Sequence, residues 1–274
     1  MSGRLERRFA ELDAAGRGGL VLFITAGDPD HATSAAILAG LAGAGADVIE
    51  LGMPFSDPMA DGPVIQAAGG RALAAGANMH RTLDLVRDFR ATDDHTPIVL
   101  MGYFNPIYAY GVTAFAADAG AAGVDGLIIV DLPPEEEDEL APDARAAGID
   151  IIRLIAPTTG DARLAAILNG TGGFVYYVSI AGVTGAAAAA EADIAAGIAR
   201  IRRATDLPVA IGFGIKTPQQ VATMAKIGDA AVVGSALVQH IADNLDDAGR
   251  TGPDLVENVL GFAAQLGRAV REKS

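Results

Sequence analysis

Two carboxylates, Glu50 and Asp61, are the side chains of this sequence best placed to do chemistry. Glu50 lies inside the apolar run at residues 48–51, and Asp61 closes the turn-rich loop that follows. A glutamate inside a buried strand is costly unless it has a partner or gives up its charge, so burial raises the pKa of its carboxyl. Because a loop residue can reach back over a strand end, we expect the pair to flank one site and to transfer protons there.

Both carboxylates also have simpler interpretations. Glu50 could face water from a frayed strand end, and Asp61 could be only a turn residue. The elements around them must therefore decide whether the two side chains converge.

Short apolar runs alternate with helix-like segments along the whole chain, and their number predicts a (β/α)8 barrel, an α/β fold, as a single domain over residues 1–274. An extra N-terminal helix and a short helix after the eighth strand complete the prediction. A doubly wound open sheet is the competing fold, but it would need a glycine fingerprint at residues 25–29, which read TAGDP. The expected strands cover residues 20–25, 47–51, 97–101, 126–130, 150–155, 174–179, 208–211 and 230–233.

Glycine-rich turns follow the last three expected strands, at residues 182–185, 212–214 and 234–235. Glycine lets the backbone approach a ligand closely, and a helix that starts at Ser235 would point its N–H groups at an anion. Loops after strands seven and eight bind phosphate in many such barrels. The turns therefore predict a phosphorylated substrate.

Composition excludes several other classes of protein. The net charge of −14 argues against nucleic acid and anionic membranes as partners, since both require basic patches. The three lysines (Lys216, Lys226 and Lys273) are poorly placed for a Schiff base, and the four histidines are too scattered for a metal site. The absence of cysteine and of an N-terminal signal fits a cytoplasmic location. Metal-free acid–base catalysis is what remains.

Residues 51–63, LGMPFSDPMADGP, resemble the signature of the tryptophan synthase α subunit family. Four further motifs follow in the family's order: MGYFNP at 101–106, DLP at 131–133, AGVTG at 181–185 and GFGI at 212–215. The resemblance covers nearly the whole chain. It implies a lyase that cleaves indole-3-glycerol phosphate to indole and glyceraldehyde 3-phosphate in tryptophan biosynthesis.

The resemblance also implies roles for individual residues. Glu50 corresponds to the general acid–base, and Asp61 to the carboxylate that engages the indole N–H. Tyr176 corresponds to an assisting hydroxyl, while Thr184 could contact the substrate or only stabilise its turn. Gly185, Gly214, Gly234 and Ser235 match the phosphate cradle, and Phe23, Met101, Tyr103, Ile128, Val130, Leu154 and Phe213 match the indole slot.

A partner follows from the same resemblance. The family's α subunit passes indole to a β subunit that carries pyridoxal phosphate, in an α2β2 heterotetramer, and needs no cofactor or metal of its own. Residues 53–58 and 103–110 resemble the surface that faces the β subunit. Ile180 and Ala181 depart from members that carry an arginine and a small hydroxyl residue there. Another phosphosugar barrel of the same pathway and a mainly regulatory binding subunit remain as alternatives.

Overall fold

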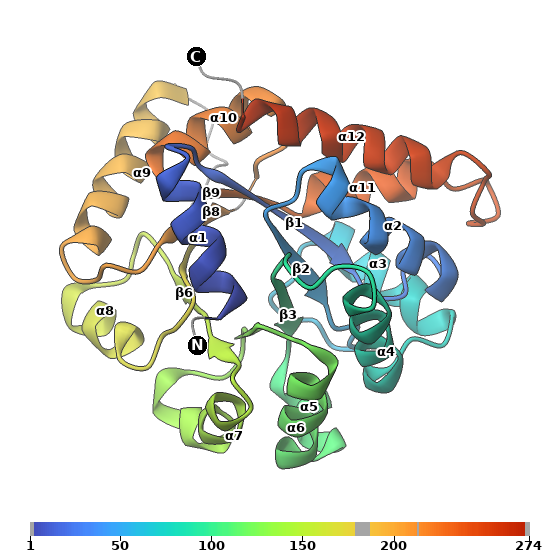
Figure 1. Ribbon diagram of the computed structural model, residues 1–274, viewed down its shortest axis with the longest axis horizontal. Coiled ribbons are helices and arrows are strands. Elements are labelled where there is room, and N and C mark those ends of the chain that lie inside the picture. The colour runs from blue at the N-terminus through green and yellow to red at the C-terminus, as the bar shows by residue number, and fades with distance from the viewer. Residues whose placement is uncertain (1–2, 179–186, 213, 272–274) are drawn as a thin grey trace.

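The apolar runs form parallel strands and the segments between them form helices, which together build a barrel (Figure 1). The structure, a computed structural model, describes residues 3–178, 187–212 and 214–271. The strands are β1 (Gly19–Thr25), β2 (Val48–Gly52), β3 (Ile98–Gly102), β4 (Gly126–Ile129), β5 (Asp150–Ile151), β6 (Arg153–Ile155), β7 (Val175–Val178), β8 (Val209–Gly212) and β9 (Ala230–Val233).

The helices lie between and outside the strands, as expected for parallel neighbours joined by crossovers. They are α1 (Arg4–Ala14), α2 (His31–Ala44), α3 (Pro63–Ala74), α4 (Met79–Arg90), α5 (Phe104–Tyr110), α6 (Val112–Ala122), the 3-10 helix η1 (Pro134–Glu139), α7 (Ala141–Ala146), α8 (Asp161–Leu168), α9 (Ala187–Arg202), α10 (Pro218–Ile227), α11 (Ser235–Asp243) and α12 (Leu255–Ala269).

The strand order is β5-β4-β3-β2-β1-β9-β8-β7-β6, with every pairing parallel. The predicted barrel fold is confirmed, with one difference in the fifth strand. That strand is split at Ile152 into β5, which pairs with β4, and β6, which pairs with β7. The two ends of the strand order are thus consecutive in the chain, so the sheet curls into a nearly closed barrel with a seam between β4 and β6.

Two helical segments differ from what the sequence alone indicates. The pattern of residues 135–147 predicts one helix, but these residues form η1 followed by α7, and the break falls at Leu140, whose φ of −134° is not helical. Pro142 sits in the first turn of α7, a position that proline tolerates because its missing N–H has no partner there. The short helix α5 was not predicted, because seven residues carry too little periodic pattern to distinguish a helix from a loop.

The barrel has an inner and an outer core. Val21, Val48 and Phe174 belong to the inner one, together with Leu5 and Phe9 of α1, which close the end where the strands begin. Figure 1 shows α1 in front of the strands. The outer core fills the space between strands and helices. Since α1 closes one end, ligands must enter from the end where the strands finish.

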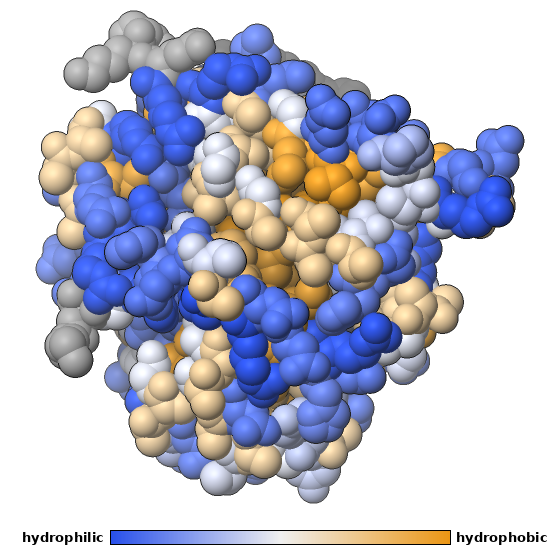
Figure 2. All heavy atoms as spheres, turned by 45° about the vertical axis from the view of Figure 1, so that its right-hand side comes forward, coloured by the Kyte–Doolittle hydropathy of each residue, from blue (hydrophilic) through white to orange (hydrophobic). Residues whose placement is uncertain are grey.

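The outer helices pack closely, and their exposed surface is mixed. A Cβ added to Gly267 of α12 would lie 2.6 Å from the carbonyl oxygen of Ala44 in α2, so glycine is needed for this approach. Figure 2 shows hydrophilic side chains round most of the edge of one face, with apolar side chains grouped in its middle.

Candidate functional site

Glu50 points into the barrel from the middle of β2. Its neighbours Ile49 and Leu51 belong to the outer core, whereas Val48, two residues earlier, belongs to the inner one, so alternation places Glu50 inside. The residue is 1% exposed, and its Oε1 has no hydrogen-bond partner among the described residues. Burial raises the pKa of Glu50 to about 8, so the carboxyl is mostly neutral at pH 7 and can donate a proton.

Tyr176 of β7 also faces the inner core. Burial, and secondarily the negative charge of Glu50, raise the pKa of Tyr176 well above its usual value. The phenol is held against β8, because a Cβ added to Gly212 would lie 2.3 Å from its Oη. Glycine at position 212 is therefore what leaves room for a hydroxyl close to the glutamate.

Asp61 is half-buried at the end of the loop that follows β2. Burial raises the pKa of Asp61, while a hydrogen bond from Tyr103 opposes that rise. The Tyr103 hydroxyl also accepts a 3.0 Å hydrogen bond from the backbone N–H of Ala60, and its ring lies 5.4 Å from that of Phe55. Tyr103 thus anchors the loop to the end of β3 and holds the second carboxylate over the barrel.

A cavity of about 30 Å³ lies beneath this loop, enough space for about one water molecule. Its walls include Phe23, Met101, Tyr103, Val130 and Asp61, so five of the predicted site residues meet there. The wall continues through Thr25, Gly52, Met53, Pro54, Phe55, Pro58, Ile65, Gly69 and Gly102.

Thr25 is a residue of this cavity that the sequence analysis missed. It is 3% exposed, and its hydroxyl has no partner among the described residues. The available signal was alternation along β1, where Val21, Phe23 and Thr25 share the inward face. A hydroxyl on that face at the carboxyl end of a strand lies where such barrels bind their ligands.

The predicted phosphate cradle is described in part. Gly234 precedes α11, and Ser235 is the first residue of that helix, so the free N–H groups of its first turn face the end of the barrel. A Cβ on Gly234 would lie 3.4 Å from the Cβ of Phe23, which places the start of α11 beside the small cavity. Gly214 has a φ of +76°, a conformation that favours glycine. Thr184, Gly185 and Phe213 lie outside the described residues.

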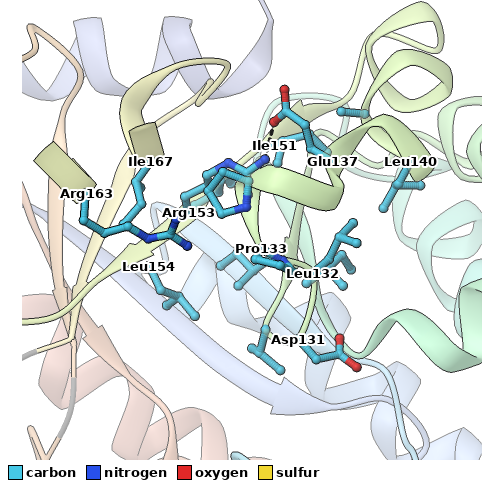
Figure 3. A pocket seen from close by; sticks show the side chains of 16 residues that line it. Asp131, Leu132, Pro133, Glu137, Leu140, Ile151, Arg153, Leu154, Arg163 and Ile167 are labelled. Carbon is cyan, nitrogen blue, oxygen red and sulfur yellow. Dashed lines mark hydrogen bonds and ion pairs between the residues drawn. The ribbon is translucent and has the colours of Figure 1, made fainter. Parts of the chain in front are cut away.

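Two further predicted slot residues, Ile128 and Leu154, line a second and larger cavity of about 360 Å³ together with Val130 (Figure 3). Only Val130 is shared between the two cavities. The structure therefore divides the predicted slot between one group of residues at the ends of β1 to β3 and another at the seam beside β4 and β6.

The segments predicted to face a partner are only partly at the surface. Met53 and Tyr103, which begin the two ranges, are buried, whereas Tyr108 is 67% exposed. Met59, one residue beyond the first range, is 85% exposed. The described residues contain no group of three or more histidines and carboxylates arranged to hold a metal ion.

Known proteins that are similar to this chain share one description. A family model described as tryptophan synthase alpha chain matches residues 9–266. The chain is 58% identical over 268 residues to the tryptophan synthase alpha chain of Acidiphilium cryptum, covering 98% of this chain and 97% of that one. The same identity holds for the alpha chain of Gluconacetobacter diazotrophicus, with 98% of each chain covered.

Solved structures give the same result. Tryptophan synthase subunit alpha from Legionella pneumophila superposes with a TM-score of 0.90 at 38% identity, covering 99% of both chains. A chain of tryptophan synthase from M. tuberculosis in an aminoacrylate-bound form has a TM-score of 0.85 at 33% identity, covering 98% of this chain and 100% of that one.

Proposed function

This chain belongs to the tryptophan synthase alpha chain family, and we propose that it cleaves indole-3-glycerol phosphate to indole and glyceraldehyde 3-phosphate with Glu50 as its acid–base residue. The observation that carries the assignment is the buried Glu50 carboxyl, which has no cationic partner among the described residues and a pKa of about 8. Such a group holds a proton at neutral pH yet can release it to a substrate, as a residue that serves as acid and then as base must do.

The reaction needs two proton transfers. Neutral Glu50 donates its proton to C3 of the indole ring, which leaves the ring nitrogen as an iminium. The resulting carboxylate then takes the proton of the hydroxyl on the attached glycerol carbon. The carbon–carbon bond breaks, its electron pair returns to the ring, and the glycerol carbon becomes the aldehyde. Glu50 ends protonated as it began, so the cycle balances without a metal or an added cofactor.

Asp61 and Tyr176 support these steps. Asp61, placed above the slot by Tyr103, accepts the indole N–H and stabilises the positive charge that develops on the ring nitrogen. Tyr176 lies beside Glu50 and stays protonated because its pKa is raised well above the usual value, so its hydroxyl can hydrogen-bond the glutamate carboxylate or the substrate. Both residues act on charge that appears only during the reaction.

The phosphate fits the start of α11. Gly234 and Ser235 present backbone N–H groups there, and the helix dipole favours a dianion at its N-terminus. Gly214, in its left-handed conformation, adds a turn in which backbone can approach the phosphate closely. We propose that Gly185 and Thr184 complete this cradle, and that Phe213 completes the indole slot.

A beta chain is the partner of a tryptophan synthase alpha chain. We propose that this chain joins a beta chain in an α2β2 heterotetramer in the cytoplasm, and that the beta chain carries pyridoxal phosphate while this chain carries no cofactor. The exposed side chains of Met59 and Tyr108 lie on elements at the site end of the barrel, and they suit an apolar contact there. Across the part of the chain that the structure describes, no helix has the length and apolarity to cross a membrane.

Indole release from indole-3-glycerol phosphate by the purified chain tests the proposal. Replacing Glu50 by glutamine should lower kcat/KM by about 10³-fold, since general acid–base catalysis contributes 10²–10⁴-fold. The matched control is Glu139→Gln, because Glu139 is exposed on η1 and should be dispensable. Full activity in the Glu50→Gln variant would contradict the assignment, and a wild type that binds its partner but releases no indole would favour a regulatory subunit.

A further inference from the structure

Two buried carboxylates, Asp28 and Asp47, are held by arginines in the same way at opposite ends of the barrel. Arg71 donates to the two oxygens of Asp28 at 2.7 and 2.9 Å, and Arg17 donates to those of Asp47 at 2.7 and 2.9 Å. The carboxylate side chains are 0% and 2% exposed, and the arginine side chains 25% and 24%. Because the two bidentate pairs match in geometry and burial, a difference in their roles must come from what they connect.

The Asp28 pair joins the carboxyl end of β1 to the last turn of α3. Asp28 follows β1 by three residues, and its backbone N–H donates to the carbonyl oxygen of Thr25 at 3.2 Å. Arg71 lies in the last turn of α3. A Cβ added to Gly27 would lie 2.9 Å from the Cβ of Ala77, so the same loop also packs closely against the chain just beyond α3. The pair therefore fixes one end of this helix to the barrel.

The other end of α3 forms part of the catalytic site. Ile65 and Gly69 line the small cavity beneath Asp61. Asp61 lies two residues before α3 begins, and its backbone carbonyl accepts a 2.8 Å hydrogen bond from Nε2 of Gln66. Because a helix moves largely as one rigid element, a shift at the last turn of α3 also shifts the residues at its first turn. The position of Asp61 thus depends on how the far end of the helix is held.

The buried face of α3 resists sliding only weakly. Its buried residues are Ala68, Gly69 and Ala72, which carry at most one methyl group each. Helices are usually fixed against their neighbours by large side chains that interdigitate, and small residues supply little of this. Directional bonds are therefore important for the position of α3. A bidentate bond from arginine suits this role, because its planar geometry fixes angle as well as distance.

We propose that Arg71 is a positioning residue for the lyase reaction: its bidentate bond to Asp28 sets the position of α3, and α3 sets the position of the Asp61 carboxylate. The inference rests on the proposed function, because it connects Arg71 to the step in which Asp61 stabilises the positive ring nitrogen. Arg71 does not line the catalytic cavity in the part of the chain that the structure describes, so it acts only through α3. Arg17 joins segments that precede β1 and β2 and has no such connection.

Arg71→Lys and Arg17→Lys are matched variants that test the proposal. Each keeps the positive charge but loses the bidentate bond, so both should lower the midpoint of urea denaturation by similar amounts. Indole release should separate them, because a small misplacement of a group in the site is costly: Arg71→Lys should lower kcat/KM on the order of 10-fold, mainly through kcat, and Arg17→Lys by less than about 2-fold. Equal kcat/KM values in the two variants would overturn the proposal.

A double-mutant cycle shows whether Arg71 acts through Asp61. In an Asp61→Asn background, Arg71→Lys should lower kcat/KM further by about 2-fold or less, because the group that Arg71 positions is already lost. A further loss of about 10-fold in that background would mean that Arg71 acts elsewhere, and it would also overturn the proposal. Asp28→Asn, with Asp47→Asn as its match, repeats the comparison from the carboxylate side if Arg71→Lys does not fold.

Amide hydrogen exchange tests the same connection without the reaction. The backbone N–H of Ala60, beside Asp61, donates to the Tyr103 hydroxyl at 3.0 Å. Exchange at Ala60, followed by NMR, should become at least about 5-fold faster in Arg71→Lys and change by less than about 2-fold in Arg17→Lys. Unchanged exchange in Arg71→Lys would overturn the proposal. A wild type that releases no indole, combined with faster exchange in Arg71→Lys, would contradict the proposed function but support the coupling of Arg71 to this loop.

Discussion

Buried carboxylates at the two ends of the barrel have opposite environments. Where the strands begin, Asp47 pairs with Arg17 at 2.7 Å, and Asp125 pairs with Arg90 and Arg4 at 2.6 and 3.0 Å. Nearer the end where the strands finish, Glu50 in the middle of β2 has no cationic partner among the described residues. Asp47 and Glu50 are three residues apart in the chain, yet one is fully paired and the other is left alone.

The contrast teaches which end serves stability and which serves chemistry. Asp47 and Asp125 also accept the backbone N–H groups of Leu20 and Ile98, so each fastens neighbouring strands together. Each of these carboxylates accepts three hydrogen bonds from protein groups, which leaves it little capacity to bind a substrate. Glu50 carries the cost of burial without such compensation, and this keeps its proton available. In barrels of this type the strand beginnings serve stability and the strand ends serve catalysis.

The largest expected effect concerns stability against pH. Because the folded-state pKa of Glu50 is raised from 4.5 to about 8, its neutral form stabilises the fold fully below pH 4.5, and that contribution is lost as pH rises through 8. The Glu50→Gln variant has no carboxyl to ionise at this position. Its free energy of unfolding should therefore be higher than that of the wild type by on the order of 4 kcal/mol above pH 8, and by little below pH 4.5. Urea denaturation of both proteins at several pH values measures this difference. A difference that does not vary with pH would contradict the conclusion that burial raises the pKa of Glu50.

Asp47→Asn tests the other end of the barrel. The amide leaves Arg17 without its charge partner, so we expect a loss of about 3 kcal/mol in the free energy of unfolding. Catalysis should remain within about 2-fold for the folded fraction, because Asp47 is remote from the strand ends. Urea denaturation and indole release measured on the same preparation provide the check. A large loss of kcat in folded protein would mean that the two ends are not separate in function.

Asp61→Asn should reduce kcat/KM for indole release by about 30-fold, or about 2 kcal/mol, because the amide cannot stabilise a positive ring nitrogen by charge. Asp57→Asn is the matched control, since Asp57 lies exposed in the same loop and its carboxylate accepts a hydrogen bond only from its neighbour Ser56 among the contacts described. Equal losses in the two variants would indicate that loop order, and not the charge of Asp61, had changed.

Tyr176→Phe should have the smallest effect, a decrease of about 3-fold in kcat, since it removes one hydroxyl and leaves the Glu50 carboxyl in place. Tyr177→Phe is the control, because Tyr177 faces the outer core. A loss in Tyr176→Phe as large as that in Glu50→Gln would give the tyrosine a proton-transfer role of its own.

Local sequence patterns were sufficient for most of the fold. Asp30 caps α2 by accepting the N–H of Thr33, and Gly45 ends the same helix with a left-handed φ of 112°, which are the positions that these residue types prefer. The split of the fifth strand at Ile152 was not predictable, because residues 150–155 are uniformly strand-like. Which neighbour each half pairs with depends on how the barrel closes.

The sequence by itself determined the barrel fold, the position of Glu50 inside a strand and the glycine turns at strand ends, because periodicity and residue type fix these locally. Only the tertiary structure decided that Glu50 lacks a cationic partner among the described residues while Asp47 is paired with Arg17. The tertiary structure also placed Tyr176 beside Glu50 and against Gly212, and it opened a cavity at the seam. Burial and pairing are properties of what surrounds a side chain, and those surroundings come from strands far apart in the chain.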